Sequence, residues 1–136
     1  MQECTTSIRV LYGDVDAMGV VHHANYLRFF EAARTEYLRA RGRTYAEVEA
    51  AGVMLPVVDV QVRYLSPARY DDLLAVSARI TELKRVSVAF TYEVRRMGED
   101  TVLTRGRTIL AVCDRTGRLR PMPPELRTLL VGPPAG

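Results

Sequence analysis

One stretch of this chain, residues 26–41, repeats its apolar residues at the three- and four-residue steps of an α-helix. Charged residues fill most of the positions between them. Asn25 is a suitable N-cap, and Gly42 is suitable just past the end, because each can satisfy backbone groups that a helix end leaves unpaired. The pattern therefore predicts one long amphipathic helix over Tyr26–Arg41, with its apolar side buried. The apolar positions are Tyr26, Phe29, Phe30, Ala33, Tyr37 and Ala40.

Most of the remaining chain favours strands. Apolar residues alternate with other residues from Leu74 to Ile80 and from Val86 to Val94, as expected when one face of a sheet is buried. Short helices are predicted from Thr44, which forms a capping box with Glu47, and near residues 124–130. One long helix covered by an antiparallel sheet is an α+β domain. The predicted strands cover residues 5–12, Val57–Tyr64, Leu73–Lys84, Val86–Arg96 and Thr101–Cys113.

Length and composition indicate one folded domain. The chain has 136 residues, which suits a single core. Hydrophobic residues make up 48% and charged residues 26%, which is typical of soluble globular proteins and disfavours disordered, collagen and coiled-coil classes. We expect a domain over residues 1–131 and a flexible tail over residues 132–136, which is rich in glycine and proline.

Charge and cysteine content narrow the function classes further. Nineteen Lys and Arg residues against sixteen Asp and Glu give a net charge of +3, and because these charges are interspersed they do not indicate a nucleic-acid partner. Cys4 and Cys113 match no spacing of a disulfide or metal framework. The N-terminus has no export pattern, and no apolar run is long enough to cross a membrane. We therefore expect a cytoplasmic protein without membrane insertion.

The loop just before the long helix holds both histidines of the chain and two aspartates. Asp14 and Asp16 precede His22 and His23, which lie at the expected helix N-terminus. A helix N-terminus presents unpaired N–H groups and a partial positive charge, which can hold a carbonyl oxygen that becomes negative during a reaction. A carboxylate from the same loop could act there as nucleophile or general base. This combination is the one that acyl transfer needs.

Other interpretations of this loop stay open. An Asp-x-Asp pair near glycines also forms Asx turns, and histidines before a helix also serve as packing or capping residues. The same residues include metal-ligand types, but no His-x-x-x-His or cysteine pair orients them, so we expect no metal site.

Three segments together resemble a known family. They are Tyr12–Arg34, Tyr64–Asp72 and Thr81–Phe90. They are similar to hotdog-fold acyl-CoA thioesterases, in the branch of 4-hydroxybenzoyl-CoA thioesterase and its relatives near the bacterial Tol–Pal cluster. The first segment is a long contiguous match, and the others extend the resemblance over nearly the whole domain.

The resemblance implies a fold, an assembly and a set of catalytic residues. The fold is a five-stranded antiparallel sheet wrapped around one long central helix, and the assembly is a homodimer or homotetramer with its sites at a subunit interface. Asp16, the second aspartate of the pair, attacks the thioester carbonyl or activates water. The backbone N–H of His23 contacts the oxyanion, and its imidazole is a further catalytic candidate. Tyr12 matches a tyrosine that lies close to the aspartate.

The same resemblance suggests substrate-binding residues. His22 takes a position that is commonly aromatic in the relatives, and Glu31 lies where a second hotdog branch has its carboxylate on the helix. CoA carries phosphates that require Arg or Lys, and the turn at Lys84 and Arg85 matches a similar turn in the relatives. The predicted binding residues are His22, Glu31, Lys84, Arg85 and Ser87, with Arg63 and Arg69 as further candidates for phosphate contacts.

The predicted function is hydrolysis of an acyl-CoA to a free carboxylic acid and CoA, with no metal and no cofactor apart from the CoA of the substrate. One alternative is a non-catalytic hotdog module that binds acyl thioesters, since a fold does not fix a function. A hydratase on the same scaffold is a further alternative, but the sequence lacks the hydration loop of those relatives. The preferred acyl group and the choice between nucleophile and general base are left open.

Overall fold

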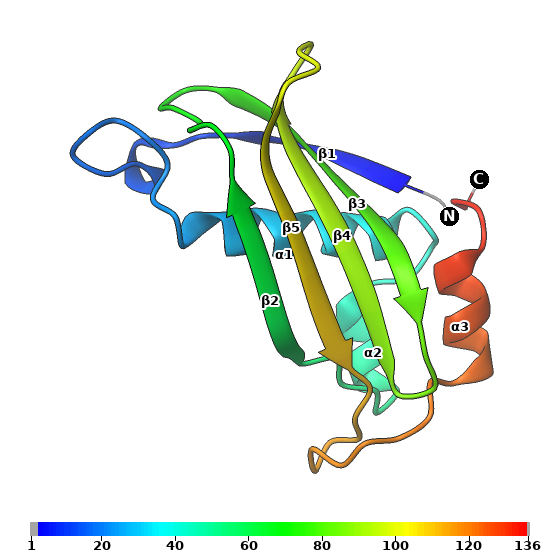
Figure 1. Ribbon diagram of the computed structural model, residues 1–136. Coiled ribbons are helices and arrows are strands. Elements are labelled where there is room, and N and C mark those ends of the chain that lie inside the picture. The colour runs from blue at the N-terminus through cyan, green and yellow to red at the C-terminus, as the bar shows by residue number, and fades with distance from the viewer. Residues whose placement is uncertain (1–2, 136) are drawn as a thin grey trace.

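The structure is a computed structural model that describes residues 3–135. Five strands, three α-helices and one short 3₁₀ helix follow one another along this range (Figure 1). Their bounds are β1 (Glu3–Arg9), η1 (Tyr12–Asp14), α1 (Asn25–Arg39), α2 (Tyr45–Ala50), β2 (Val57–Tyr64), β3 (Leu73–Leu83), β4 (Ser87–Arg96), β5 (Val102–Ala111) and α3 (Pro124–Val131).

All five strands form one antiparallel sheet in the order β1-β3-β4-β5-β2. The long helix α1 lies across one face of this sheet (Figure 1). The predicted α+β fold with one central helix is confirmed. In the described part of the chain, β1 and β2 are the two edge strands, and each pairs with a single neighbour.

The core lies between α1 and the inner face of the sheet. Phe29, Phe30, Ala33 and Tyr37 of α1 are fully buried, and so are the alternating apolar residues of β3 and β4. The Phe30 ring stacks on Tyr92 with ring centroids 4.4 Å apart and crosses β5 directly over Gly106. A Cβ at Gly106 would overlap the Phe30 ring, so glycine permits this close approach of helix and sheet.

The helix ends agree only partly with prediction. Asn25 is not the N-cap of α1 but its first helical residue, and its side-chain amide donates instead to the Asp14 carbonyl at 2.8 Å. The predicted capping box of α2 is confirmed, because the Thr44 hydroxyl accepts the Glu47 N–H at 3.2 Å. Gly42 has a φ of +96°, as a residue that reverses the chain after a helix requires.

The segment after α3 contacts the C-terminal end of α1. The Ala135 N–H donates to the Ala40 carbonyl at 2.8 Å, and the Arg41 side chain donates to the Gly132 carbonyl at 3.2 Å. The predicted flexible tail of residues 132–136 lies partly outside the described residues, because Gly136 is not among them. The described part of this segment makes the two contacts above.

Candidate active site

The two aspartates of the loop between β1 and α1 have different surroundings. Asp14 is buried, forms an ion pair with Arg28 and accepts the Leu11 N–H at 2.8 Å. Asp16 is exposed, and its Oδ1 accepts the Met18 N–H at 2.8 Å in a tight turn. Asp14 is thus occupied by contacts within the chain, whereas Asp16 presents its carboxylate to the surface.

Backbone hydrogen bonds close the turn that begins at Asp16. The Asp16 N–H donates to the Val20 carbonyl at 2.9 Å, and the Gly19 N–H donates to the Asp16 carbonyl at 3.0 Å. Gly19 has a φ of +78°, which favours glycine at this corner. Val20 also forms an isolated bridge with Arg69, which ties the turn to the loop that follows β2.

The backbone N–H groups just before α1 are paired, with one exception. The His22 N–H donates to the Asp14 carbonyl at 2.9 Å, and the Asn25 N–H donates to the His22 carbonyl at 2.9 Å. The Ala24 N–H donates to Nδ1 of the His22 ring at 3.2 Å. Within residues 3–135, the N–H of His23 has no acceptor. Because a helix N-terminus carries partial positive charge, this N–H is available to the oxygen of a bound molecule.

Asp16 and His23 line the same cavity, which has a volume of about 320 Å³. Two tyrosines that were not predicted as site residues complete it, Tyr26 from α1 and Tyr64 from the end of β2. The remaining wall consists of apolar and small residues from the turn and from the loop after β2. These are Val20, Val21, Leu65, Ser66 and Pro67.

Tyr64 connects β2 to the N-terminus of α1. Its hydroxyl donates to the His23 carbonyl at 2.8 Å, and its ring packs edge-on against Tyr26 with centroids 5.4 Å apart. Burial and the neighbouring Tyr26 raise the pKa of the Tyr64 hydroxyl above its ordinary value of 10.0. The hydroxyl is therefore protonated at neutral pH and keeps its role as donor.

Three other residues predicted for the site, Tyr12, His22 and Glu31, do not line this cavity. Tyr12 is 80% exposed and packs edge-on against Tyr70, and the His22 ring stacks on His23 with centroids 4.2 Å apart. Glu31 lies further along α1, 3.9 Å from the buried Arg34. Glu31 and Arg34 line a second cavity of about 280 Å³ between α1 and the start of β2.

The turn predicted to bind phosphates joins β3 to β4 at the opposite end of the sheet from the end of β2, where Tyr64 lines the cavity (Figure 1). In the strand ladder, Val88 is in the row of Leu110 and Val57, whereas Val94 is in the row of Thr104 and Tyr64. Six residues of strand therefore separate the two ends, which is about 20 Å. One chain alone does not bring Lys84, Arg85 or Ser87 to Asp16.

The described residues include no metal-binding arrangement: no three His, Cys, Asp or Glu side chains of residues 3–135 are grouped to hold a metal ion. In the same range, no helix is long and apolar enough to cross a membrane. The cavity is lined by an accessible carboxylate, by His23, whose backbone N–H has no acceptor among residues 3–135, and by several apolar side chains. A carboxylate facing a polarised carbonyl suits attack on an acyl group.

This sheet and helix, with a cavity at the helix N-terminus, define a hotdog-fold domain. A family model described as "Thioesterase-like superfamily" matches residues 10–130. The chain belongs to the thioesterase-like superfamily and is a thioester hydrolase, which confirms the resemblance noted in the sequence.

Individual relatives agree with this assignment. The acyl-CoA thioester hydrolase YbgC of Escherichia coli is 38% identical over 114 residues, which are 84% of each chain. A hypothetical protein from Aquifex aeolicus has a crystal structure with a TM-score of 0.88 and 32% identity, covering 93% of this chain and 98% of that one. A mutant 4-hydroxybenzoyl-CoA thioesterase, solved with 4-hydroxybenzoyl-CoA, has a TM-score of 0.85 and 27% identity, covering 96% and 99%.

Proposed function

We propose that this protein hydrolyses an acyl-CoA to a carboxylic acid and CoA at the cavity formed by Asp16 and His23. The observation that supports this most is that one cavity holds both an accessible carboxylate and the N-terminus of α1, where the His23 N–H has no acceptor within residues 3–135. The similarity to an acyl-CoA thioester hydrolase and to a 4-hydroxybenzoyl-CoA thioesterase supports CoA as the carrier of the acyl group.

In the proposed reaction, the thioester carbonyl oxygen accepts a hydrogen bond from the His23 N–H. This contact stabilises the negative charge that develops on the oxygen, and the partial charge of the helix N-terminus adds to it. The His23 imidazole lies beside the same site and is a further candidate for proton transfer. The Tyr64 hydroxyl donates to the His23 carbonyl and so restrains the peptide bond that follows His23.

Asp16 can act in two ways. As a general base it takes a proton from water, the oxygen of that water adds to the carbonyl carbon, and the C–S bond then breaks to release CoA thiolate, which regains a proton. As a nucleophile, one Asp16 oxygen adds to the carbonyl carbon and CoA thiolate leaves, which forms an anhydride that water hydrolyses. In either route water is the only co-reactant, and we propose that no metal or further cofactor takes part.

We also propose that the active form is a homodimer or homotetramer, with the site at a subunit interface. Two observations support this. The positive turn at Lys84 and Arg85 lies about 20 Å from the cavity within one chain, and the edge strand β2 has no buried residue. A cytoplasmic location stays a prediction.

The first experiment measures thiol release from short, long and aromatic acyl-CoAs. We expect the wild type to hydrolyse at least one of them and Asp16→Asn to lose about 10²-fold or more in kcat, because the amide can neither attack nor accept a proton. Asp100→Asn, in the exposed hairpin between β4 and β5, is the matched control and should retain full activity.

Circular dichroism and CoA binding must be unchanged in Asp16→Asn for the comparison to count. Full activity of a folded Asp16→Asn variant would remove Asp16 from the reaction. CoA binding without hydrolysis of any substrate by the wild type would favour a binding module. A single turnover in ¹⁸O-water would leave label in the Asp16 carboxylate only if the anhydride forms.

A further inference from the structure

Arg34 of α1 is a buried cation without a close carboxylate. The residue is 9% exposed, and within residues 3–135 the nearest carboxylate, that of Glu31, lies 3.9 Å from its guanidinium. This distance is too long for a hydrogen bond. The Glu31 side chain is itself 67% exposed, so water solvates its charge. Buried arginines are normally paired, because an uncompensated charge in the interior is costly.

Two tyrosines beside Arg34 add no negative charge. Burial raises the pKa of the Tyr45 and Tyr92 hydroxyls above the ordinary value of 10.0, although the neighbouring Arg34 guanidinium acts in the opposite direction. Both hydroxyls are therefore protonated at neutral pH. The guanidinium keeps its positive charge for a bound group.

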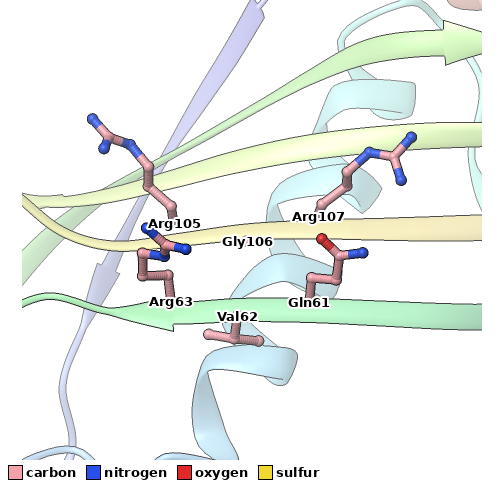
Figure 2. Close-up of a pocket in the computed structure, with 6 residues that line it drawn as sticks. All are labelled: Gln61, Val62, Arg63, Arg105, Gly106 and Arg107. Atoms are coloured by element: carbon pink, nitrogen blue, oxygen red, sulfur yellow. The ribbon is translucent and has the colours of Figure 1, made fainter.

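The arginines on the outer face of the sheet differ from Arg34. Figure 2 shows Arg63, Arg105 and Arg107 around a shallow groove of about 240 Å³. Arg105 binds Glu93 at 3.1 Å, and Arg107 binds Glu82 at 3.0 Å. Arg63 is exposed to water. Each of these three charges is paired or hydrated, so the groove gives no comparable reason to expect a ligand.

Arg34 lines the cavity of about 280 Å³ between α1 and the start of β2. Two other charged residues contribute to its wall, but Arg28 binds Asp14 and Glu31 is exposed. The apolar part of the wall consists of Leu27, Val57 and Val60. An apolar wall with one buried cation suits an apolar chain that ends in an anion.

This cavity follows the active-site cavity along α1. Tyr26 lines the active-site cavity, and the next residue, Leu27, lines the cavity of Arg34. On β2, Tyr64 lines the first cavity, and Val60, on the same face of the strand, lines the second. An acyl group held at the active site can therefore extend between α1 and β2 toward Arg34.

The helix geometry sets the length of such an acyl group. Arg34 follows His23 by eleven residues, which is about three turns or 16 Å and returns to nearly the same side of the helix. The Arg34 guanidinium approaches Glu31, one turn closer to His23. About 11 Å therefore separate the His23 N–H from the guanidinium.

We propose that Arg34 binds a free carboxylate at the far end of the acyl group, so that the preferred substrates are CoA thioesters of dicarboxylic acids. This proposal rests on the proposed function and names its substrate class. The carboxylate accepts two parallel hydrogen bonds from the guanidinium, and the methylene groups contact Leu27 and Val60. Glu31 turns its exposed carboxylate toward water.

Substrate length tests the proposal on the wild type. The seven C–C bonds of an octanedioyl group span about 9 Å, and hydrogen bonds at both ends supply the rest, whereas a butanedioyl group spans only about 4 Å. We expect kcat/KM for octanedioyl-CoA to exceed that for octanoyl-CoA about tenfold. Butanedioyl-CoA should have no such advantage over butanoyl-CoA. Equal values for the two eight-carbon substrates would overturn the proposal.

Variants of α1 test the role of Arg34 itself. Arg34→Gln should abolish the roughly tenfold preference for octanedioyl-CoA, because the amide carries no charge. Glu31→Gln should raise the preference about twofold, because it removes a negative charge near the bound carboxylate. Arg39→Gln is the matched control, since Arg39 is an exposed arginine of the same helix that pairs with Glu36. An unchanged preference in a folded Arg34→Gln variant would contradict the proposal.

Calorimetry with the free acids separates this proposal from the proposed function. Octanedioate should bind the wild type about tenfold more tightly than octanoate. Such binding without hydrolysis of any acyl-CoA would contradict the proposed function alone. Hydrolysis of octanoyl-CoA and octanedioyl-CoA at equal rates, with equal binding of the two acids, would contradict the role of Arg34 alone.

A carboxylate of a partner subunit is the rival occupant of this site. In that case Arg34→Gln would weaken the dimer in sedimentation at a series of dilutions and leave the substrate preference unchanged. That result would overturn the proposal.

Discussion

Asp14 and Asp16 are two residues apart in one loop, yet the structure uses them differently. The Asp14 carboxylate is 8% exposed and holds Arg28 and the Leu11 N–H, whereas Asp16 lines the cavity. The pattern Asp-Val-Asp does not distinguish the two aspartates. The difference arises because Arg28, a polar position near the start of the helix, forms an ion pair with Asp14. We therefore expect substitution of each aspartate to affect a different property.

Asp14→Ala should lower the free energy of unfolding by about 1–3 kcal/mol, because it leaves the partly buried Leu11 N–H and the Arg28 guanidinium without their acceptor. Urea denaturation followed by circular dichroism measures this loss. Asp100→Ala, at an exposed position, should change stability by less than about 0.5 kcal/mol. A stability of Asp14→Ala equal to that of the wild type would show that the contacts of Asp14 with Arg28 and Leu11 contribute nothing.

Tyr64→Phe should lower kcat about fivefold and leave KM unchanged. The variant keeps the ring but loses the hydrogen bond to the His23 carbonyl, which is worth about 1 kcal/mol and positions the helix N-terminus rather than the substrate. Tyr70→Phe is the control, because Tyr70 packs on Tyr12 outside the cavity. A rise in KM with constant kcat would instead make Tyr64 a substrate-binding residue.

The sequence places Asp16 and His23 within one loop, and they line one cavity; their catalytic roles stay predictions. Tyr64 could not be predicted as part of this cavity from spacing, because it lies 41 residues from His23 and reaches it through the pairing of β2 with β5. The sequence does give one indication of its role: Tyr64 is the last residue of a predicted strand and the first residue of Tyr64–Asp72, the second segment that resembles the family.

At the scale of the elements, strand prediction succeeded where one face is buried. Alternation in β3 and β4 matches the buried positions from Leu74 to Ile80 and from Val88 to Val94. The prediction of Asn25 as N-cap was wrong because of a contact with the preceding loop. The Asn25 side-chain amide donates to the Asp14 carbonyl of the β1–α1 loop, so the side chain is not used for the local capping hydrogen bond that its residue type favours.

The outer face of the sheet carries a charge cluster with a pH signature. Burial alone would raise the pKa of Glu93, but hydrogen bonds from Arg95 at 2.8 Å and Arg105 at 3.1 Å outweigh it and hold the pKa below its ordinary value of 4.5. A lowered pKa in the folded state means that the carboxylate stabilises the fold above pH 4.5. This contribution is lost as the pH falls through the folded-state pKa.

Glu93→Gln should therefore reduce the free energy of unfolding at pH 7 by about 0.5–1 kcal/mol, a value kept small because the side chain is partly exposed. The difference from the wild type should shrink steadily below pH 4.5. Thermal unfolding at pH 7 and at pH 3 measures the loss of stability and its decrease at low pH. Glu99→Gln, in the exposed hairpin, is the control. A difference that is the same at both pH values would exclude the charge as its cause.

At the scale of the whole molecule, the separation of the cavity from the Lys84–Arg85 turn predicts complementation between subunits. Asp16→Asn and the double variant Lys84→Ala/Arg85→Ala should each be poorly active alone. Mixed and allowed to exchange subunits, they form dimers with one intact site, so about a quarter of wild-type activity should return. Thiol release before and after exchange measures this. Absence of recovery in verified mixed dimers would mean that each site draws on one chain.

The exposure of β2 also bears on how the chain avoids misassembly. A newly folded single copy presents a valine-rich strand with an open edge, which is the kind of segment that seeds cross-β aggregates. Asp59 and Arg63 interrupt this apolar run with charges that repel any in-register parallel stack of identical strands. These two residues therefore disfavour fibre growth, so the edge strand can be rich in valine without becoming an aggregation seed.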